Sequence, residues 1–310
     1  MPFVEKIFVV FVFGGIAVVG GVEFCFLLDF VWSRCQKGRR KSSISSKPAV
    51  AVHVVGVIGL ACLIYGFFIE PYWVEVNQFT IKTSKLEKAN FRIVQFSDTH
   101  CDMKMRNEKK LVEIVNSLKP DVIIFTGDAV NTEKAAELFR GTMKALETNI
   151  AKLAIRGNWS HVAGDDELFE GTGFEVLNGE KQVIEKDGEK IVVYGFNFWD
   201  SSSKDSLLSS SSENSYNVFL YHSPDLVEDI QGHDVDMYLC GHTHGGQIAL
   251  PFYGAIITFS KFGKKYEAGL YKVGETDLYV NRGLGMEGGH APRVRFFARP
   301  EIAVFDIVGE

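Results

Sequence analysis

Polar side chains follow five apolar runs of this 310-residue chain, at the point where each run ends. They are Asp98, His100, Asp128, Asn158, His222, His242 and His244. In open α/β sheets, sites form just outside the carboxyl ends of the strands. Carboxylate, amide and imidazole groups in this mixture suit Mn, Fe or Zn. The placement therefore predicts a site for two divalent ions, which together can clamp a phosphoryl group.

Two of the motifs repeat one spacing, Asp98-Thr99-His100 and His242-Thr243-His244. In an extended segment, residues i and i+2 point the same way, so each pair is expected to face one ion. Asp128 has two carboxylate oxygens and can bridge two ions.

Glycines stand directly before three of these ligands, at Gly127, Gly157 and Gly241. Glycine is expected where the backbone turns sharply or where another group must approach closely. We therefore interpret these glycines as part of the site.

The elements that must position the ligands alternate along the chain. Strand-like runs cover 91–96, 121–126, 152–156, 217–221 and 236–240. Helical spacing covers 107–117 and 133–148, with Thr132 as the cap of the second helix. This alternation predicts a mostly parallel sheet with helices on its faces.

The rhythm changes in the second half of the chain. Residues 181–194 are typical of a hairpin turning at Asp187-Gly188, and short β runs with glycine turns fill 248–305. The serine-rich stretch 201–212 is expected to be a surface loop. The predicted fold is α/β, a two-sheet sandwich flanked by helices.

Two apolar runs precede this domain, at 7–28 and 49–69, and each has the roughly 20 residues that a membrane-spanning helix needs. We therefore predict two N-terminal transmembrane helices, with Glu23 near the headgroups. The expected organisation is a membrane module at 1–70, a linker with a connecting strand at 71–90, and a catalytic domain at 91–310. The lipid bilayer is the expected partner.

Charge is unevenly distributed. Residues 34–47 contain six Lys or Arg and no acidic residue, and cytoplasmic loops carry such an excess. Counted this way, the positive charge of this loop predicts that the catalytic domain lies outside the cytoplasm.

The net charge of −6 argues against nucleic-acid binding, which favours basic domains. Five cysteines without regular spacing disfavour a disulfide framework.

The ordered set of metal ligands resembles the calcineurin-like metallophosphoesterase superfamily over about residues 91–305. The stretches GHTHGGQ (241–247) and NRGLG (281–285) look like its membrane-associated bacterial branch. The resemblance implies one ion on Asp98, His100, Asp128 and His244, and a second on Asp128, Asn158, His222 and His242. It also implies that a hydroxide between two ions (Mn, Zn or Fe, with Mn favoured) attacks phosphorus in line.

One residue departs from the family pattern. The family usually has His after the Asn of its third motif, and Trp159 stands there in this chain. An indole N–H can donate a hydrogen bond but is no acid near neutral pH. His161, two residues further on, is the rival acid. UDP-2,3-diacylglucosamine pyrophosphatases of the same superfamily also lack this His, so we hypothesise a lipid-linked pyrophosphate substrate.

Several alternatives stay open at this point. The chain could be a broad phosphodiesterase of envelope lipids or phospholipids, or a metal-binding scaffold without catalysis. Arg282 is the arginine favoured for contact with substrate phosphate. The expected location is the bacterial inner membrane. Its face is undecided, because a UDP-lipid would be expected on the cytoplasmic side, against the charge of the loop.

Overall fold

A computed structural model describes residues 3–35, 47–159, 162, 167–288 and 293–310. Contacts between residues divide the chain into two compact units, Met1–Ile69 and Glu70–Glu310. We refer to the second as the catalytic unit. His161 lies outside the described residues, so its predicted role as an acid stays a prediction.

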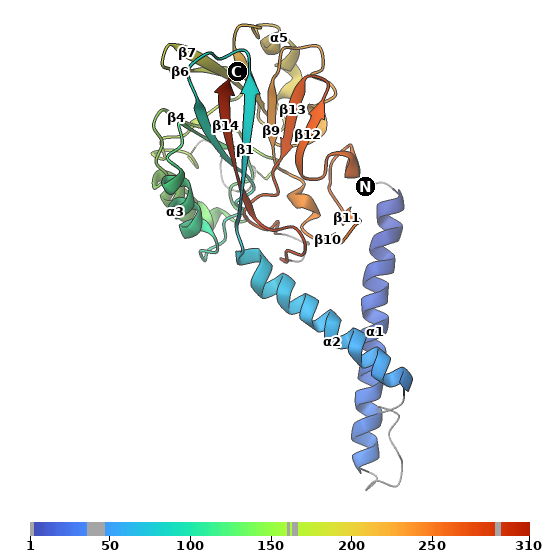
Figure 1. Ribbon diagram of the computed structural model, residues 1–310. Helices are drawn as coiled ribbons and strands as arrows, with labels where there is room; N and C mark the ends of the chain where they lie inside the picture. Colours follow the sequence, from blue (N-terminus) through green and yellow to red (C-terminus); the bar gives the residue numbers. More distant parts are fainter. Residues whose placement is uncertain (1–2, 36–46, 160–161, 163–166, 289–292) are drawn as a thin grey trace. The chain divides into compact units, whose positions relative to one another are not determined.

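The first unit consists of the helices α1 (Phe3–Cys35) and α2 (Lys47–Ile64), followed by the π-helical turn η2 (Tyr65–Ile69) (Figure 1). Within it, His53 Nδ1 lies 2.7 Å from a carboxylate oxygen of Glu23. Among the described residues, one helix has the length and apolar composition to cross a bilayer, Lys47–Tyr72. The first predicted span lies inside α1, and its insertion stays a prediction.

The catalytic unit contains two six-stranded sheets. The first has the strand order β1-β14-β2-β3-β4-β5, and the second has the order β12-β13-β9-β8-β7-β6. The strands of the first sheet are β1 (Glu75–Thr83), β14 (Glu301–Gly309), β2 (Phe91–Phe96), β3 (Val122–Phe125), β4 (Ala151–Ala154) and β5 (Glu175–Val176). Those of the second are β12 (Gly269–Val273), β13 (Thr276–Val280), β9 (Met237–Cys240), β8 (Tyr216–Leu220), β7 (Glu189–Gly195) and β6 (Glu180–Lys186).

Most neighbouring strands are parallel, as the alternation of elements predicts. The pairs β2–β3, β3–β4, β7–β8 and β8–β9 are parallel, whereas β14 runs antiparallel to β2. The predicted hairpin is β6–β7, and the predicted connecting strand is β1, which pairs with β14 at the edge of the first sheet. A small separate hairpin joins β10 (Ala249–Leu250) to β11 (Gly254–Ala255).

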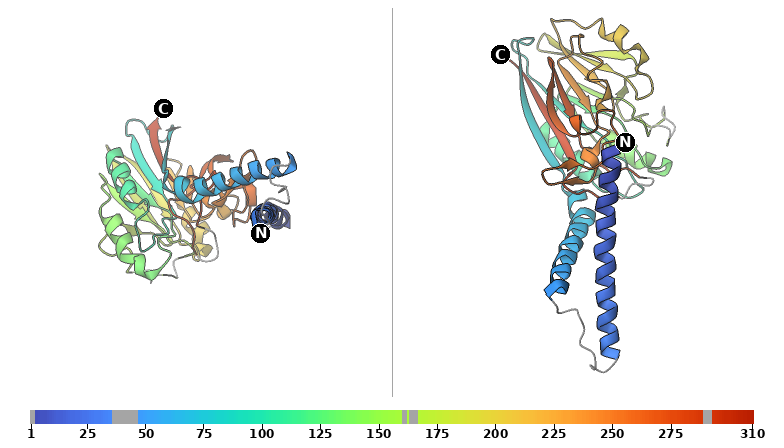
Figure 2. Two further views of the ribbon diagram at one scale, coloured as in Figure 1. Left: turned by 90° about the horizontal axis from the view of Figure 1, so that it is seen from below. Right: turned by 90° about the vertical axis from the view of Figure 1, so that its right-hand side faces the viewer.

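The sheets pack face to face over an apolar core that draws on both, including Ile93, Ile124 and Phe305 from the first and Val218 and Leu239 from the second. The helices α3 (Glu108–Leu118) and α4 (Ala136–Lys144) cover the outer face of the first sheet. Figure 2 shows these green helices on the side away from the orange strands. The observed fold is thus a mixed α/β sandwich of two sheets.

Three local predictions are wrong. The second helix ends at Lys144 instead of Thr148, because the chain turns there and buries Leu146 in the core under the helices. Thr132 makes no side-chain capping bond. The serine-rich stretch contains a short helix, α5 (Lys204–Leu208), because Leu208 is buried against the outer face of the second sheet. Composition alone does not register such long-range burial.

Candidate metal centre

The strands of both sheets end at one site. Asp98 comes two residues after β2, and Asp128 comes three after β3. From the second sheet, His222 and His242 each come two residues after their strands, β8 and β9. Both sheets therefore deliver ligand-type side chains to a common edge, as expected for parallel strands.

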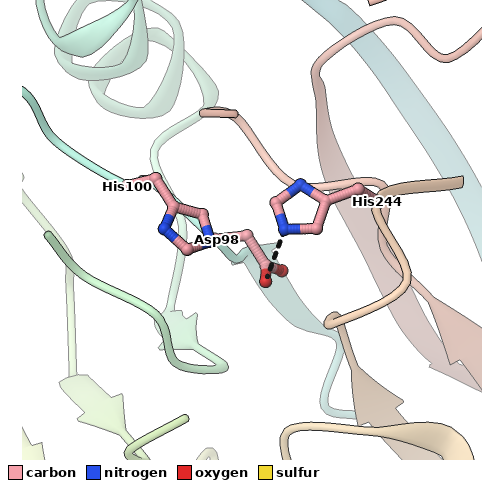
Figure 3. Close-up of side chains that lie close together, drawn as sticks. All are labelled: Asp98, His100 and His244. Atoms are coloured by element: carbon pink, nitrogen blue, oxygen red, sulfur yellow. Dashed lines mark ion pairs between the residues drawn. The ribbon is translucent and has the colours of Figure 1, made fainter. Parts of the chain in front are cut away.

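The predicted ligands form two overlapping groups around Asp98. Asp98, His100 and His244 each offer a ligand atom, and these atoms lie within 4.8 Å of one another (Figure 3). Asp98, Asp128 and His222 form the second group under the same limit. The two groups fit two neighbouring ions.

Asn158 and His242 also lie together. Nδ1 of His242 lies 2.9 Å from the side-chain oxygen of Asn158. The ring of His242 is 5.1 Å from that of His222, between centroids. All seven predicted ligands are thus gathered at this edge. Their assignment to individual ions stays a prediction.

The polar atoms of the site fit a metal. Nε2 of His100 is buried and makes no hydrogen bond within the described part of the chain, and Nε2 of His222 is buried 3.2 Å from the Asp128 carboxylate. Buried polar atoms without a partner are rare in folded proteins. Nδ1 of His222 lies 2.7 Å from the carbonyl oxygen of Thr126, which places a proton on Nδ1 and leaves Nε2 able to bind an ion.

The backbone at the ligands is not extended, so that part of the prediction is wrong. Asp98 and His100 have φ of 50° and 38°, and His242 and His244 have φ of 72° and 53°. Asp128 shares this left-handed conformation, with φ of 58°. Non-glycine residues adopt it uncommonly, and such strain clusters at functional sites.

Cross-loop hydrogen bonds hold these turns. The backbone N–H of Asp98 donates to the carbonyl of Gly127 at 2.9 Å, and that of His100 donates to the carbonyl of Asp128 at 3.1 Å. The N–H of His242 donates to the Asp98 carboxylate at 3.1 Å. These bonds join segments up to 144 residues apart in sequence, which is why local spacing did not reveal the conformation.

The glycines serve mainly close approach. A Cβ at Gly157 would collide with the carboxylate of Asp128, and one at Gly241 would collide with the carboxylate of Asp98. Of the three predicted glycines, Gly127 is the one with a left-handed backbone, at φ of 106°. The carboxylates of Asp98 and Asp128 therefore lie directly against the backbone of these glycines, where a larger residue would not fit.

Burial and mutual charge set the protonation of the metal-free site. Burial alone would lower the pKa of His222, but Asp128 and Asp98 raise it to about 9. Burial lowers the pKa of His100 to about 4 and raises that of Asp98 to about 6. For Asp128, burial is outweighed by His222 and His100, which hold the pKa of that carboxyl below its usual range. A cation at this site therefore competes with the proton on His222.

Arg295 lies behind the ligand His244 and is fully buried. Its guanidinium donates to the backbone carbonyls of His244 at 3.2 Å, Arg282 at 2.7 Å and Ala298 at 3.1 Å, and it also donates to that of Gly285. Burial lowers its pKa to about 9. We interpret Arg295 as the group that ties these loops together.

Arg282, the arginine favoured for phosphate contact, faces two carboxylates. Its guanidinium pairs with Glu75 at 2.7 Å and donates to Glu301 from Nε at 2.8 Å. Its charge is therefore matched within the fold, and contact with phosphate stays a prediction.

Trp159 lies at the site through both its backbone and its ring. Its backbone N–H donates to Asp128 at 2.9 Å, and its ring packs edge-on against His100 with centroids 5.5 Å apart. Its side chain also hydrogen-bonds Glu287, a residue that sequence reasoning missed. Burial, with Asp128 and Asp98 nearby, raises the pKa of Glu287. No local signal marks Glu287, because it follows a glycine-rich loop and no strand.

A family model of calcineurin-like phosphoesterases matches residues 91–246, which contain every predicted metal ligand. The chain belongs to this family. An uncharacterized metallophosphoesterase of Bacillus subtilis, YkuE, is 36% identical over 257 residues, covering 78% of this chain and 88% of the relative. This metallophosphoesterase is accordingly a phosphohydrolase, which disfavours the scaffold without catalysis.

More distant relatives include proteins with named activities. The phosphodiesterase YaeI of Escherichia coli is 27% identical over 255 residues, covering 79% of this chain and 92% of the relative. The UDP-2,3-diacylglucosamine pyrophosphatase LpxG of Chlamydia muridarum is 24% identical over 275 residues, covering 69% and 82%.

Proposed function

We propose that this metallophosphoesterase is a membrane-anchored, dinuclear enzyme that cleaves a lipid-linked pyrophosphate such as UDP-2,3-diacylglucosamine. The observation that carries the proposal is Trp159, which stands at a complete ligand set where the family usually has an acid. Mn is the favoured metal, with Zn and Fe as the other candidates.

The two ions would be held by overlapping sets of side chains. Asp98, His100, Asp128 and His244 would hold one ion, and Asp128, Asn158, His222 and His242 would hold the other. A bound pair of ions neutralises phosphoryl oxygens and activates water at neutral pH. The chain contributes rigid positions for these ligands, through the turns and buried contacts described above.

Trp159 bears on which bond breaks. Its backbone N–H holds Asp128, and its indole can donate a hydrogen bond to an oxygen but cannot protonate a leaving group. An alkoxide leaving group gains typically 10²–10⁴-fold from a general acid. A phosphate leaving group, whose second pKa is about 6, is weakly basic and departs without help from a general acid. The site therefore suits pyrophosphate bonds.

The apolar helix Lys47–Tyr72 supports a lipid substrate, because it would hold the catalytic unit beside a bilayer. The named activity of the distant relative LpxG points in the same direction. The face of the membrane is open. A reporter fused after Glu310 would reveal it, and alkaline-phosphatase activity there would disfavour a UDP-lipid.

The test uses purified full-length protein with Mn²⁺, and identifies products from UDP-2,3-diacylglucosamine and from a dialkyl phosphodiester. We expect turnover of the pyrophosphate and little turnover of the diester. Trp159→His should raise diester turnover by about 10²-fold, whereas Trp159→Phe, which adds no acid, should not. Preference of the wild type for the dialkyl diester would contradict the proposal.

The second candidate is a broad phosphodiesterase of envelope lipids or phospholipids. Glu287 favours it, because a carboxyl with a raised pKa beside Trp159 is a chemically competent acid. The relative YaeI is named a phosphodiesterase. Diester turnover that disappears in Glu287→Gln, or in His161→Ala, would identify the acid and support this candidate.

A further inference from the structure

Three exposed phenylalanines of the catalytic unit share an unusual backbone. Phe252, Phe259 and Phe297 are the exposed phenylalanines of its described part, and their φ values are 65°, 54° and 53°. A bulky residue in the left-handed region is a genuine outlier. The ring of Phe252 is fully exposed, and those of Phe259 and Phe297 are more than half exposed, although Phe297 also packs edge-on against Phe296.

The backbone of Phe297 is hydrogen-bonded to Glu70, near the end of the apolar helix Lys47–Tyr72. The backbone N–H groups of Phe297 and Ala298 both donate to the carboxylate of Glu70, which is fully buried. Glu70 lies in the last turn of that helix. If this helix crosses a bilayer, Phe297 lies at the level where the helix leaves it.

The hairpin β10–β11 is joined to the chain next to Phe297. The backbone of Ala249 in β10 donates to the carbonyl of Phe296 at 2.7 Å. Phe252 stands at the tip of this hairpin and is fully exposed. Figure 1 shows β10 and β11 at the end of the catalytic unit where the chain arrives from the apolar helix.

The segment after the ligand His100 also contacts the end of this helix. The side chain of Asn107 donates to the carbonyl of Pro71 at 2.8 Å, and Lys110 donates to that of Tyr72. This loop exposes Met103 and Met105 on either side of Lys104. An apolar and basic surface of this kind fits the anionic lipid interface.

Tyr72 and Trp73 complete the surface. Both are exposed, and the guanidinium of Arg299 lies 3.8 Å from the centroid of a Trp73 ring. Tyr and Trp gather where membrane meets water. We call the set the apolar rim: Tyr72, Trp73, Met103, Met105, Phe252 and Phe297.

We infer that the apolar rim rests on an anionic bilayer and presents the metal centre to lipid headgroups. The inference builds on the proposed membrane span and lipid substrate. The link to the site is Phe259, whose carbonyl lies 3.3 Å from Nε2 of His242. Phe259 lies seven positions after Phe252, across β11, so one short segment joins the rim to a predicted metal ligand.

Photo-crosslinking of the full-length protein tests the contact directly. The protein is placed in vesicles of phosphatidylcholine and phosphatidylglycerol, with benzoylphenylalanine in place of Phe252 or Phe297. Val183 and Leu270, exposed apolar residues on edge strands, serve as matched control positions, and Val57 in α2 reports insertion of the span.

We expect lipid adducts at Phe252, Phe297 and Val57, and none at Val183 or Leu270. Adducts at Val57 without adducts at the rim would overturn the inference while leaving the membrane span intact. Adducts from the rim to a second polypeptide would also overturn it, because the surface would then bind protein. Equal adducts at all positions would mean that the contact is unspecific, which likewise contradicts it.

A kinetic arm separates the rim from the proposed substrate. In the variant Phe252→Ser with Phe297→Ser, the ratio of turnover on lipid substrate to turnover on a soluble phosphodiester with an acidic leaving group should fall about tenfold. Val183→Ser should leave this ratio unchanged. If the enzyme does not cleave the lipid pyrophosphate at all, the proposed function fails, and the adducts still decide on the rim.

Discussion

The metal centre and the apolar rim use the same backbone conformation in opposite surroundings. Five of the seven predicted ligands have a left-handed backbone, as do the rim residues Phe252 and Phe297. At Asp98, His100 and Asp128 the strained residues are buried and hydrogen-bonded across loops. Phe252 and Phe297 have exposed rings.

The difference teaches how to interpret strain in this fold. In the metal centre, long-range hydrogen bonds and close glycine contacts hold the turns, so the strain positions ligands. At the rim, the ring of Phe252 is fully exposed and that of Phe297 is more than half exposed, so burial within the fold offsets little of the strain. Backbone strain at exposed residues such as Phe252 therefore indicates a surface that binds a partner. Backbone strain in the metal centre indicates residues that are positioned to bind metal.

The largest expected effect comes from removing the charge of Asp128. Asp128→Asn should lower phosphohydrolase activity about a thousandfold, because ion-based stabilisation of the transition state is worth several kcal/mol. Asp187→Asn is the matched control, since Asp187 also has a left-handed backbone but lies in the β6–β7 turn. The measurements are turnover and bound metal by elemental analysis. Equal loss in both variants would mean that strain relief, and not ligation, explains the effect.

Arg295 tests whether buried hydrogen bonds hold the ligand turns. Arg295→Met leaves buried carbonyls without donors and should lower the free energy of unfolding by about 3 kcal/mol. Denaturant titration measures this loss, and metal affinity should fall with it because the turn at His244 loosens. Arg299→Met, at the more exposed arginine over Trp73, should change stability by less than about 1 kcal/mol. Unchanged metal affinity in Arg295→Met would contradict the positioning role.

The protonation of His222 makes metal binding depend on pH. Because its pKa in the metal-free site is about 9, Mn²⁺ affinity should rise about tenfold per pH unit from pH 7 to 8, with one proton released. Calorimetry in buffers of different ionisation enthalpy counts that proton. The raised pKa also stabilises the metal-free protein below pH about 6.5, and this contribution is lost as pH rises through about 9. Binding without proton release would show that His222 is not the displaced acid.

The smallest effect concerns the rim alone. Asn tolerates a left-handed backbone better than Phe, so Phe252→Asn should stabilise the detergent-solubilised protein by about 0.5 kcal/mol. Thermal unfolding in detergent measures this gain. Asp128→Gly, which also relieves a left-handed residue, should instead abolish metal binding. A destabilised Phe252→Asn variant would mean that the ring packs on the fold and would weaken the comparison.

Much of the architecture follows from local patterns. Local spacing of apolar residues predicts the strand runs, the β6–β7 hairpin and the helix at 107–117. Each is observed close to its predicted place. The seven predicted ligands also come together, because parallel strands end at one edge. The helix after Thr132 and the serine-rich stretch were mispredicted, because Leu146 and Leu208 are buried against distant residues.

By itself, the sequence determined which side chains meet at the strand ends and that Trp159 replaces the expected acid. Tertiary structure alone decided the left-handed turns at the ligands, the carbonyl cluster on Arg295, the contact of Glu287 with Trp159, and the apolar rim beside Glu70. The physical reason is distance along the chain. Glu70 and Phe297 lie 227 residues apart, and Asp98 and His242 lie 144 apart. Their hydrogen bonds exist only once strands far apart in the sequence have come together.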